Sequence, residues 1–238
     1  MAALDKRTGE LLWRSTEVKH QAAYASPMLA EVDGVRQYVV LTNQGVCGVS
    51  AKDGRLLWQF DQRYGTEVVN SPIVRGPLVY LTVGGSHGCD LLRLVRDGDG
   101  FKPEPVYSNK NMSNHHGNVV LVDGHVYGAG GGKGWVCQSF ESGEIAWADR
   151  SKLRSGAVTY ADGRLYTYAE NDGTVMLVEA NPAACNVVGS FKPLERSKLR
   201  KPQGKIWTPP VVSGGRLFLR DQEYVYCYDV IAAASRNR

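Results

Sequence analysis

Hydrophobic and polar residues alternate over short stretches along the whole chain, which is the pattern of half-buried β-strands. The stretches 36–42, 78–82 and 216–219 are examples. A turn with glycine precedes each of them, and the Asp-Gly and Gly-Gly pairs among these turns favour tight β-hairpins. The turn glycines stand at positions 34, 76, 124, 163 and 215, so one unit repeats about every 45 residues.

A second pattern lies between these hairpins. Segments 3–13, 48–58 and 137–147 each contain a glycine followed four residues later by tryptophan, and the pattern restarts at 227. It predicts a strand, a turn whose glycine takes a positive φ, and a second strand that ends in a large aromatic residue. The residues predicted to have this structural docking role are Asp5, Gly9, Trp13, Gly54, Trp58, Gly143 and Trp147.

Together the two patterns give about five units of four short strands, with no helical period between them, which favours an all-β fold, a β-propeller of four-stranded antiparallel blades. A β-sandwich and a β-solenoid are the alternatives. We expect a single propeller domain over 1–238. Its predicted blade units are 1–15 (partial), 24–60, 67–108, 115–148, 155–192 and 206–230.

The motif Ala-x-Asp-x-x-Thr-Gly-x-x-x-Trp in 3–13 resembles the tryptophan-docking motif of the PQQ-like repeat (quinoprotein-type) propellers. This family includes pyrroloquinoline quinone (PQQ) alcohol dehydrogenases and the assembly lipoprotein BamB. Segments 115–117, 134–137, 198–202 and 206–207 look most like PQQ-binding-like repeat proteins of planctomycete-type bacteria. The resemblance implies that each tryptophan docks on the neighbouring blade, and that the protein is bacterial and periplasmic or secreted.

Composition adds limits to this picture. The chain has 238 residues, of which 43% are hydrophobic and 22% charged, as in an ordinary globular domain. It contains neither a long apolar stretch nor a signal peptide pattern. Because the chain starts in the middle of a predicted blade, we expect it to be the C-terminal part of a larger propeller. Segment 10–15 is then a candidate for the fourth strand of the last blade, which would close the ring.

The loops of a propeller differ between its two faces. Here the turns within the hairpins are tight, whereas the connections between blades and the turns between second and third strands are longer and polar. Function usually resides in such loops, so we expect a protein or carbohydrate ligand on this loop face. The alternative is that these side chains only satisfy loop backbone groups. The candidate ligand-binding residues are Tyr24, Asn70, Asn114, His115, His116, Arg154, Lys205 and Trp207.

The sequence predicts neither catalytic nor metal-binding residues. His115 and His116 are adjacent, so a strand would point them to opposite sides. By resemblance, a PQQ enzyme needs calcium held by carboxylate and amide groups. No Asp or Glu stands at the predicted blade entries, and Glu67 is the nearest. PQQ with calcium is therefore a cofactor that only the resemblance implies.

Two further features have ordinary explanations. The five cysteines are far apart and are predicted to be small buried hydrophobic residues. The basic loop 193–205 lacks interleaved aromatic residues, so we expect a solvated surface or a clamp for an acidic partner rather than a nucleic-acid site.

Three functions remain open. The one that we favour is a non-catalytic binding or scaffold module. The second is a PQQ-dependent alcohol or sugar dehydrogenase completed by upstream blades. The third is an envelope assembly factor similar to BamB.

Overall fold

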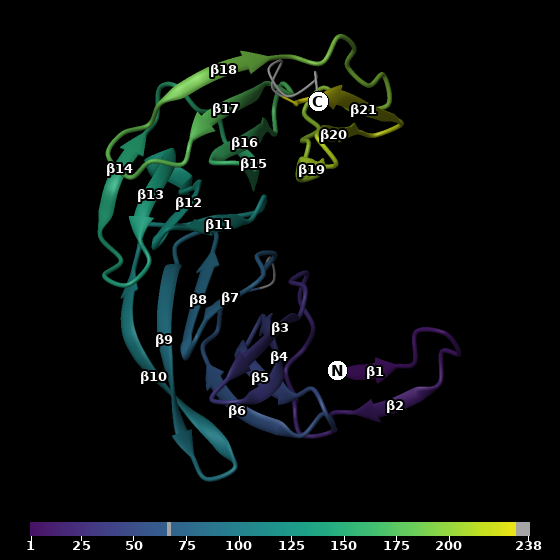
Figure 1. The fold of residues 1–238 in the computed structure, drawn as a ribbon, viewed down its shortest axis with the longest axis vertical. Helices are drawn as coiled ribbons and strands as arrows, with labels where there is room; N and C mark the ends of the chain where they lie inside the picture. The colour runs from purple at the N-terminus through teal and green to yellow at the C-terminus, as the bar shows by residue number, and fades with distance from the viewer. Residues whose placement is uncertain (66–67, 232–238) are drawn as a thin grey trace. The chain divides into compact units, whose positions relative to one another are not determined.

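The computed structural model describes residues 1–65 and 68–231, and these consist of β-strands with a single three-residue 3-10 turn, η1 (Gly131–Lys133). The strands form four sheets of four strands, one of three and one of two (Figure 1). Within each sheet, strands that are consecutive in the chain pair antiparallel, so the sheets of three and four strands are meanders. The prediction of an all-β chain built from four-stranded antiparallel units is confirmed.

The chain divides into two compact units, of which the first comprises Met1–His115 and Glu141–Gly143. It holds a two-stranded sheet and two four-stranded sheets. Within this unit, β3 lies against β7 and β6 against β10. The strands are β1 (Ala2–Leu4), β2 (Leu11–Arg14), β3 (Met28–Val32), β4 (Val35–Thr42), β5 (Gly45–Ser50), β6 (Leu56–Asp61), β7 (Ile73–Arg75), β8 (Leu78–Val83), β9 (Gly88–Asp97) and β10 (Gly100–Asn109).

The second unit comprises His116–Phe140 and the chain from Glu144 onward. It holds two four-stranded sheets and one three-stranded sheet, and the first strands of successive sheets lie side by side, β11 against β15 and β15 against β19. The strands are β11 (Val119–Val122), β12 (His125–Ala129), β13 (Trp135–Ser139), β14 (Ile145–Asp149), β15 (Gly156–Ala161), β16 (Arg164–Ala169), β17 (Val175–Glu179), β18 (Val187–Phe191), β19 (Val211–Ser213), β20 (Arg216–Asp221) and β21 (Tyr224–Asp229). The single domain over 1–238 and the closure of the last blade by 10–15 stay predictions.

The tight hairpins form as their turn residues predict. In the β3–β4 turn, Asp33 has a φ of 47° and Gly34 a φ of 74°. Two successive positive φ angles are those of a type I′ turn, whose twist matches that of the paired strands. The turns at Asp123-Gly124 and Asp162-Gly163 have the same signs of φ.

The core of each unit comes from the alternating apolar positions. In the first unit, Val39 and Leu41 of β4 pack with Val46 of β5 and Val79 of β8. In the second unit, Trp135 is fully buried, and its Nε1 donates to the backbone oxygen of Arg154 at 2.7 Å. This bond ties the loop after β14 to β13, so the core also positions one candidate residue.

The tryptophans of the repeated motif have two kinds of partner. Trp13 Nε1 donates to the backbone oxygen of Ala51, in the β5–β6 turn of the next sheet, at 3.2 Å. Trp147 Nε1 donates to the backbone oxygen of Asn181, beyond β17, at 2.9 Å. Trp58 differs, since its Nε1 donates to Gln37 Oε1 within its own sheet at 2.6 Å.

The Trp13 contact also requires a glycine. A Cβ at Gly54 would lie 2.4 Å from Cε3 of the Trp13 ring, and Gly54 has a φ of 75°. No side chain fits between the turn and the ring, and this φ disfavours other residues.

The cysteines follow the prediction with one exception. Cys47, Cys89, Cys137 and Cys185 are buried thiols, and burial raises the pKa of Cys47 to about 11. Cys227 is exposed on β21, so the expectation of burial is wrong for this residue.

Candidate functional site

In the second unit the structure brings three predicted residues together around a carboxylate. His116 Nε2 lies 2.9 Å from Glu170 Oε2, and Lys205 Nζ lies 3.3 Å from Glu170 Oε1. The Trp207 ring lies 4.7 Å from the His116 ring, centroid to centroid, and residue Trp207 is 58% exposed. Glu170 directly follows β16, and its backbone oxygen accepts a bond from Ile206 N at 2.7 Å, which holds the segment carrying Lys205 and Trp207 in place.

The fourth predicted residue of this unit is also paired. Arg154 Nε lies 3.8 Å from Asp172 Oδ2, and Lys192 Nζ lies 2.9 Å from the same oxygen. Burial would raise the pKa of Asp172, but hydrogen bonds from Lys192 and Thr174 outweigh it and lower the pKa. Each of the two predicted cations here therefore lies within 4 Å of a carboxylate of the turn 170–173.

In the first unit, Asn70 and Asn114 are structural neighbours. Asn70 Nδ2 donates to the backbone oxygen of Asn114 at 2.6 Å and to that of Thr82 at 3.1 Å. The two asparagines are 1% and 0% exposed. They join the connections on either side of the sheet β7–β10, and neither side chain presents itself to solvent.

The remaining two predicted residues of the first unit are accessible. Tyr24 is 73% exposed, and its backbone nitrogen donates to Val68 O at 2.9 Å. His115 is exposed beside Gly84, where a Cβ would lie only 2.7 Å from the His115 Cα.

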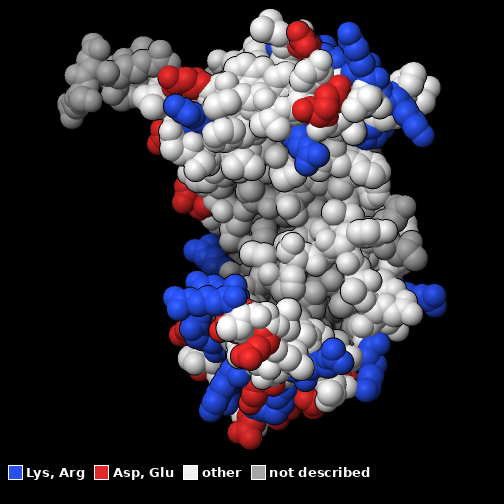
Figure 2. Space-filling model, turned by 90° about the vertical axis from the view of Figure 1, so that its right-hand side faces the viewer, with Lys and Arg blue, Asp and Glu red and all other residues white. Residues whose placement is uncertain are grey.

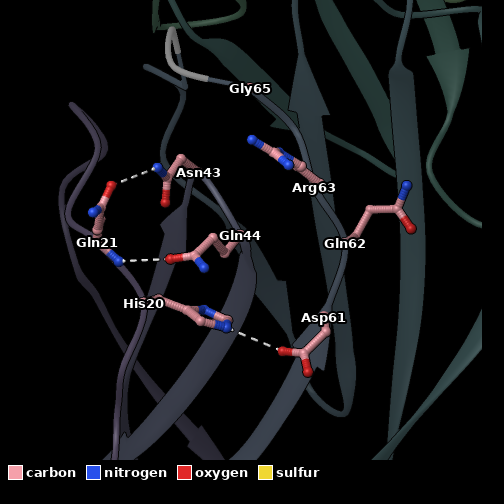
Figure 3. A pocket seen from close by; sticks show the side chains of 8 residues that line it. All are labelled: His20, Gln21, Asn43, Gln44, Asp61, Gln62, Arg63 and Gly65. Carbon is pink, nitrogen blue, oxygen red and sulfur yellow. Dashed lines mark hydrogen bonds and ion pairs between the residues drawn. The ribbon is translucent and has the colours of Figure 1, made fainter.

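A polar cavity of about 700 Å³ lies in the first unit, on the loops that the sequence indicates as the functional face. Four side-chain amides line it, together with a His–Asp pair and an arginine (Figure 3). The lining residues are His20, Gln21, Asn43, Gln44, Asp61, Gln62, Arg63 and Gly65.

Hydrogen bonds between neighbouring loops hold this lining in place. His20 Nε2 lies 3.0 Å from Asp61 Oδ1, and its Nδ1 lies 3.0 Å from Thr42 Oγ1. Gln44 Oε1 accepts from the backbone nitrogen of Gln21 at 3.0 Å. Figure 3 shows Arg63 pointing towards Asn43 and Gln44, whereas Gln62 points away from them.

Sequence reasoning named the connections that form this cavity but did not single out its residues. The signal was the concentration of amides at 21, 43, 44 and 62, in loops predicted to share one face. Glu170 was not predicted as a site residue either, because it precedes the turn 171–173 and does not stand at a blade entry.

The described side chains do not by themselves fit the calcium and quinone site that the resemblance implies. Within residues 1–65 and 68–231, no group of three or more His, Cys, Asp or Glu could hold a metal ion. Glu170 already pairs with His116 and Lys205. Glu67 lies outside the described residues.

The basic loop after β18 is less available than its sequence suggests. Arg200 is buried, with Nε 3.0 Å from Asp221 Oδ1, and Lys205 pairs with Glu170. On the face shown in Figure 2, Lys and Arg side chains are interspersed with Asp and Glu.

Across the described part of the chain, no helix is long and apolar enough to span a membrane.

The fold and its repeated turns are those of a propeller, and comparison with known families agrees. The family model described as outer membrane protein assembly factor BamB matches residues 1–183. Because the match covers more than half of the chain, the chain belongs to this PQQ-like repeat family. None of the curated proteins matches the chain in sequence.

Solved structures show the same fold at low identity. BamB from Moraxella catarrhalis is 15% identical with a TM-score of 0.50, over 95% of this chain and 74% of that one. Quinohemoprotein alcohol dehydrogenase ADHIIG from Pseudomonas putida HK5 is 15% identical with a TM-score of 0.58, over 91% and 42%. The WD40 domain of Toxoplasma gondii coronin is 12% identical with a TM-score of 0.56, over 85% and 54%.

These likenesses confirm the β-propeller fold. The chain spans less than two thirds of the length of the dehydrogenase and coronin chains. Since one such fold serves several activities, function has to be argued from the sites.

Proposed function

We propose that this chain is a non-catalytic binding module that takes a carbohydrate on its loop face, within a single propeller domain. The observation that carries the proposal is the amide-lined cavity of the first unit (Figure 3). An amide side chain presents both a donor and an acceptor, which is what the hydroxyl groups of a sugar require. Concave sites with a few fixed polar groups are typical of ligand binding.

Two glutamines of the cavity offer a test of the proposed carbohydrate binding. Gln21 and Gln44 are exposed at the cavity, and within residues 1–65 and 68–231 one side-chain atom of each takes part in a hydrogen bond to the loops around it. Titration calorimetry of the full chain with a panel of neutral and acidic tetrasaccharides should show saturable binding. Gln44→Ala should weaken this binding about tenfold, the effect of losing one well-placed hydrogen bond in a desolvated site.

The matched control is Gln203→Ala, which removes an exposed glutamine of the second unit. It should leave the affinity unchanged. If no tetrasaccharide binds to a chain whose circular dichroism shows folded β structure, the proposed function is wrong.

In the second unit we propose a further contact area around Trp207. Its exposed side chain, next to the His116 ring, would stack on a sugar or on an aromatic side chain. Trp207→Ala should reduce the affinity of this unit for its ligand without unfolding the chain, since the residue is largely exposed.

A second candidate is a role in assembling outer membrane proteins, which the family match favours. This role implies that the protein lies in the periplasm of a bacterium. The test is the level of folded outer membrane proteins in cells that lack the gene, with the full-length gene restored as the control. Unchanged levels would argue against this role.

The third candidate is the PQQ-dependent dehydrogenase. Calorimetric titration with PQQ, with and without calcium, tests it directly, and calcium-dependent micromolar binding would support it. The nearer likeness to repeat proteins of planctomycete-type bacteria likewise stays a prediction.

A further inference from the structure

A second polar cavity, of about 510 Å³, adjoins the amide-lined one in the first unit. The two cavities share Gln62 and Arg63, which form the wall between them. The second cavity lies over the β8–β9 turn and the end of β10. Its lining residues are Gln62, Arg63, Tyr64, Gly84, Gly85, Ser86, His87, Ser108 and Lys110.

Two cations of this cavity are available to a ligand. Arg63 and Lys110 are both exposed, and neither has an ion pair with any residue in 1–65 or 68–231. This differs from the second unit, where Arg154 and Lys205 are offset by Asp172 and Glu170.

Among the described residues, the carboxylate of Asp90 is hydrogen-bonded to two residues that line the cavity, Tyr64 and His87. Asp90 is 5% exposed, and its Oδ2 lies 2.7 Å from His87 Nε2 and accepts from the Tyr64 hydroxyl at 3.0 Å. Burial would raise the pKa of Asp90, but hydrogen bonds from His87, Ser108 and Tyr64 outweigh it and hold the pKa below its usual value. Asp90 is not among the residues that line the cavity, whereas Arg63 and Lys110 both line it.

The cations also have a fixed framework. The Tyr64 and His87 rings pack edge to face with centroids 4.6 Å apart, which joins the segment carrying Arg63 to the β8–β9 turn. In that turn Gly85 has a φ of 73°, and Ser86 next to it is exposed at the cavity. Arg63 therefore stands between a lining of amides and a second positive side chain.

We propose that the ligand is an acidic carbohydrate, whose hydroxyl groups occupy the amide-lined cavity and whose carboxylate lies between Arg63 and Lys110. The inference rests on the proposed function, because it names the class of sugar that the same face binds. A guanidinium pairs with a carboxylate through two parallel hydrogen bonds, and the ammonium of Lys110 adds a point charge.

The test compares each acidic oligosaccharide with its own methyl ester, which keeps the sugar and removes the charge. Tetramers of galacturonate, mannuronate and glucuronate, with their esters, are titrated into the full chain by calorimetry. One acid should bind about tenfold more tightly than its ester, as for a charge-assisted hydrogen bond. This preference should shrink with added salt, which screens exposed charges.

Lys110→Gln is the cleaner variant, because Lys110 lines only the second cavity. It should remove most of the preference for the acid while the affinity for the ester stays the same. Lys52→Gln, on the exposed β5–β6 turn, is the matched control and should change neither affinity.

The outcomes separate the two proposals. Equal binding of acid and ester, or an unchanged preference in Lys110→Gln, overturns the acidic ligand and leaves the carbohydrate module standing. Absence of binding by every acid and ester, together with the neutral tetrasaccharides, overturns both.

Discussion

Nε2 of His116 lies 2.9 Å from Oε2 of Glu170, although the two residues stand in loops next to different sheets of the second unit. The side chains are only 8% and 14% exposed. His116 stands at the entry to the sheet β11–β14, and Glu170 follows β16. The contact therefore joins the loops of two blades, and the same His116 ring also contacts the ring of Trp207.

Removal of this contact should weaken the second unit. We expect His116→Ala to lower the free energy of unfolding by about 1–3 kcal/mol, because Glu170 loses a hydrogen-bond partner in a largely buried place. Urea unfolding monitored by circular dichroism measures the change. Lys205→Ala serves as the comparison, since Lys205 is more exposed and should cost less. An equal or smaller loss in His116→Ala would contradict this order.

The hydrogen bonds to Asp90 predict that the stability of the fold decreases in acid. The pKa of Asp90 is lower in the folded state than in the unfolded chain, where it is about 3.9. Such a group stabilises the fold above the unfolded value, and this contribution falls as the pH decreases towards the folded value. The unfolding free energy, measured from pH 7 down to pH 3, should fall more steeply in the natural chain than in Asp90→Asn.

The buried ion pair of Arg200 and Asp221 should be sensitive to single changes. Their side chains are 2% and 4% exposed, so removing one partner leaves a buried charge unpaired, and Asp221→Ala should cost about 3–5 kcal/mol. The double variant Arg200→Met with Asp221→Leu should lose less than either single variant. A double variant as unstable as the sum of the two single ones would count against this explanation.

The same pair should control the basic loop. Ser197 N donates to Asp221 Oδ2 at 3.2 Å, and Arg200 Nη1 donates to the backbone oxygen of Asn171 at 2.9 Å. Asp221→Ala removes one of these anchors and disturbs the other, so trypsin should cut between 196 and 205 faster than in the natural chain. Mass spectrometry of the digest locates the cut. Unaltered cleavage rates would show that other contacts hold the loop.

The tryptophans should differ according to what their ring nitrogen binds. Trp58→Phe leaves Gln37, which is fully buried, without its partner and should cost about 1–3 kcal/mol. Trp147→Phe frees the carbonyl of Asn181 near the surface and should cost about 0.5–1.5 kcal/mol. Replacement of Trp58 by alanine should cost about 3–5 kcal/mol, because a large buried side chain is lost. Thermal unfolding of the three variants measures these losses.

Much of the fold follows from local rules that can be read directly from the sequence. The Asp-Gly pairs at 33–34, 123–124 and 162–163 sit in type I′ hairpins because few other residues tolerate two positive φ angles. Alternation along 35–42 and its repeats selects strands with one face in the core. Repetition of this unit, together with the Gly-x-x-x-Trp spacing, indicates a propeller of the PQQ-like family before any coordinates are known.

The sites depended on tertiary structure, for a physical reason. Which loop side chains meet depends on how segments far apart in sequence are brought together, as for Gln21 with Gln44 or His116 with Glu170. Burial likewise decides whether a cation is available to a ligand. Arg200 is buried against Asp221, whereas Arg63 and Lys110 line a cavity. The sequence by itself determined the strands, the turns and the family, because these follow from neighbours within a few residues. Only the packing of the loops decided where a ligand can bind, because that depends on contacts between distant residues.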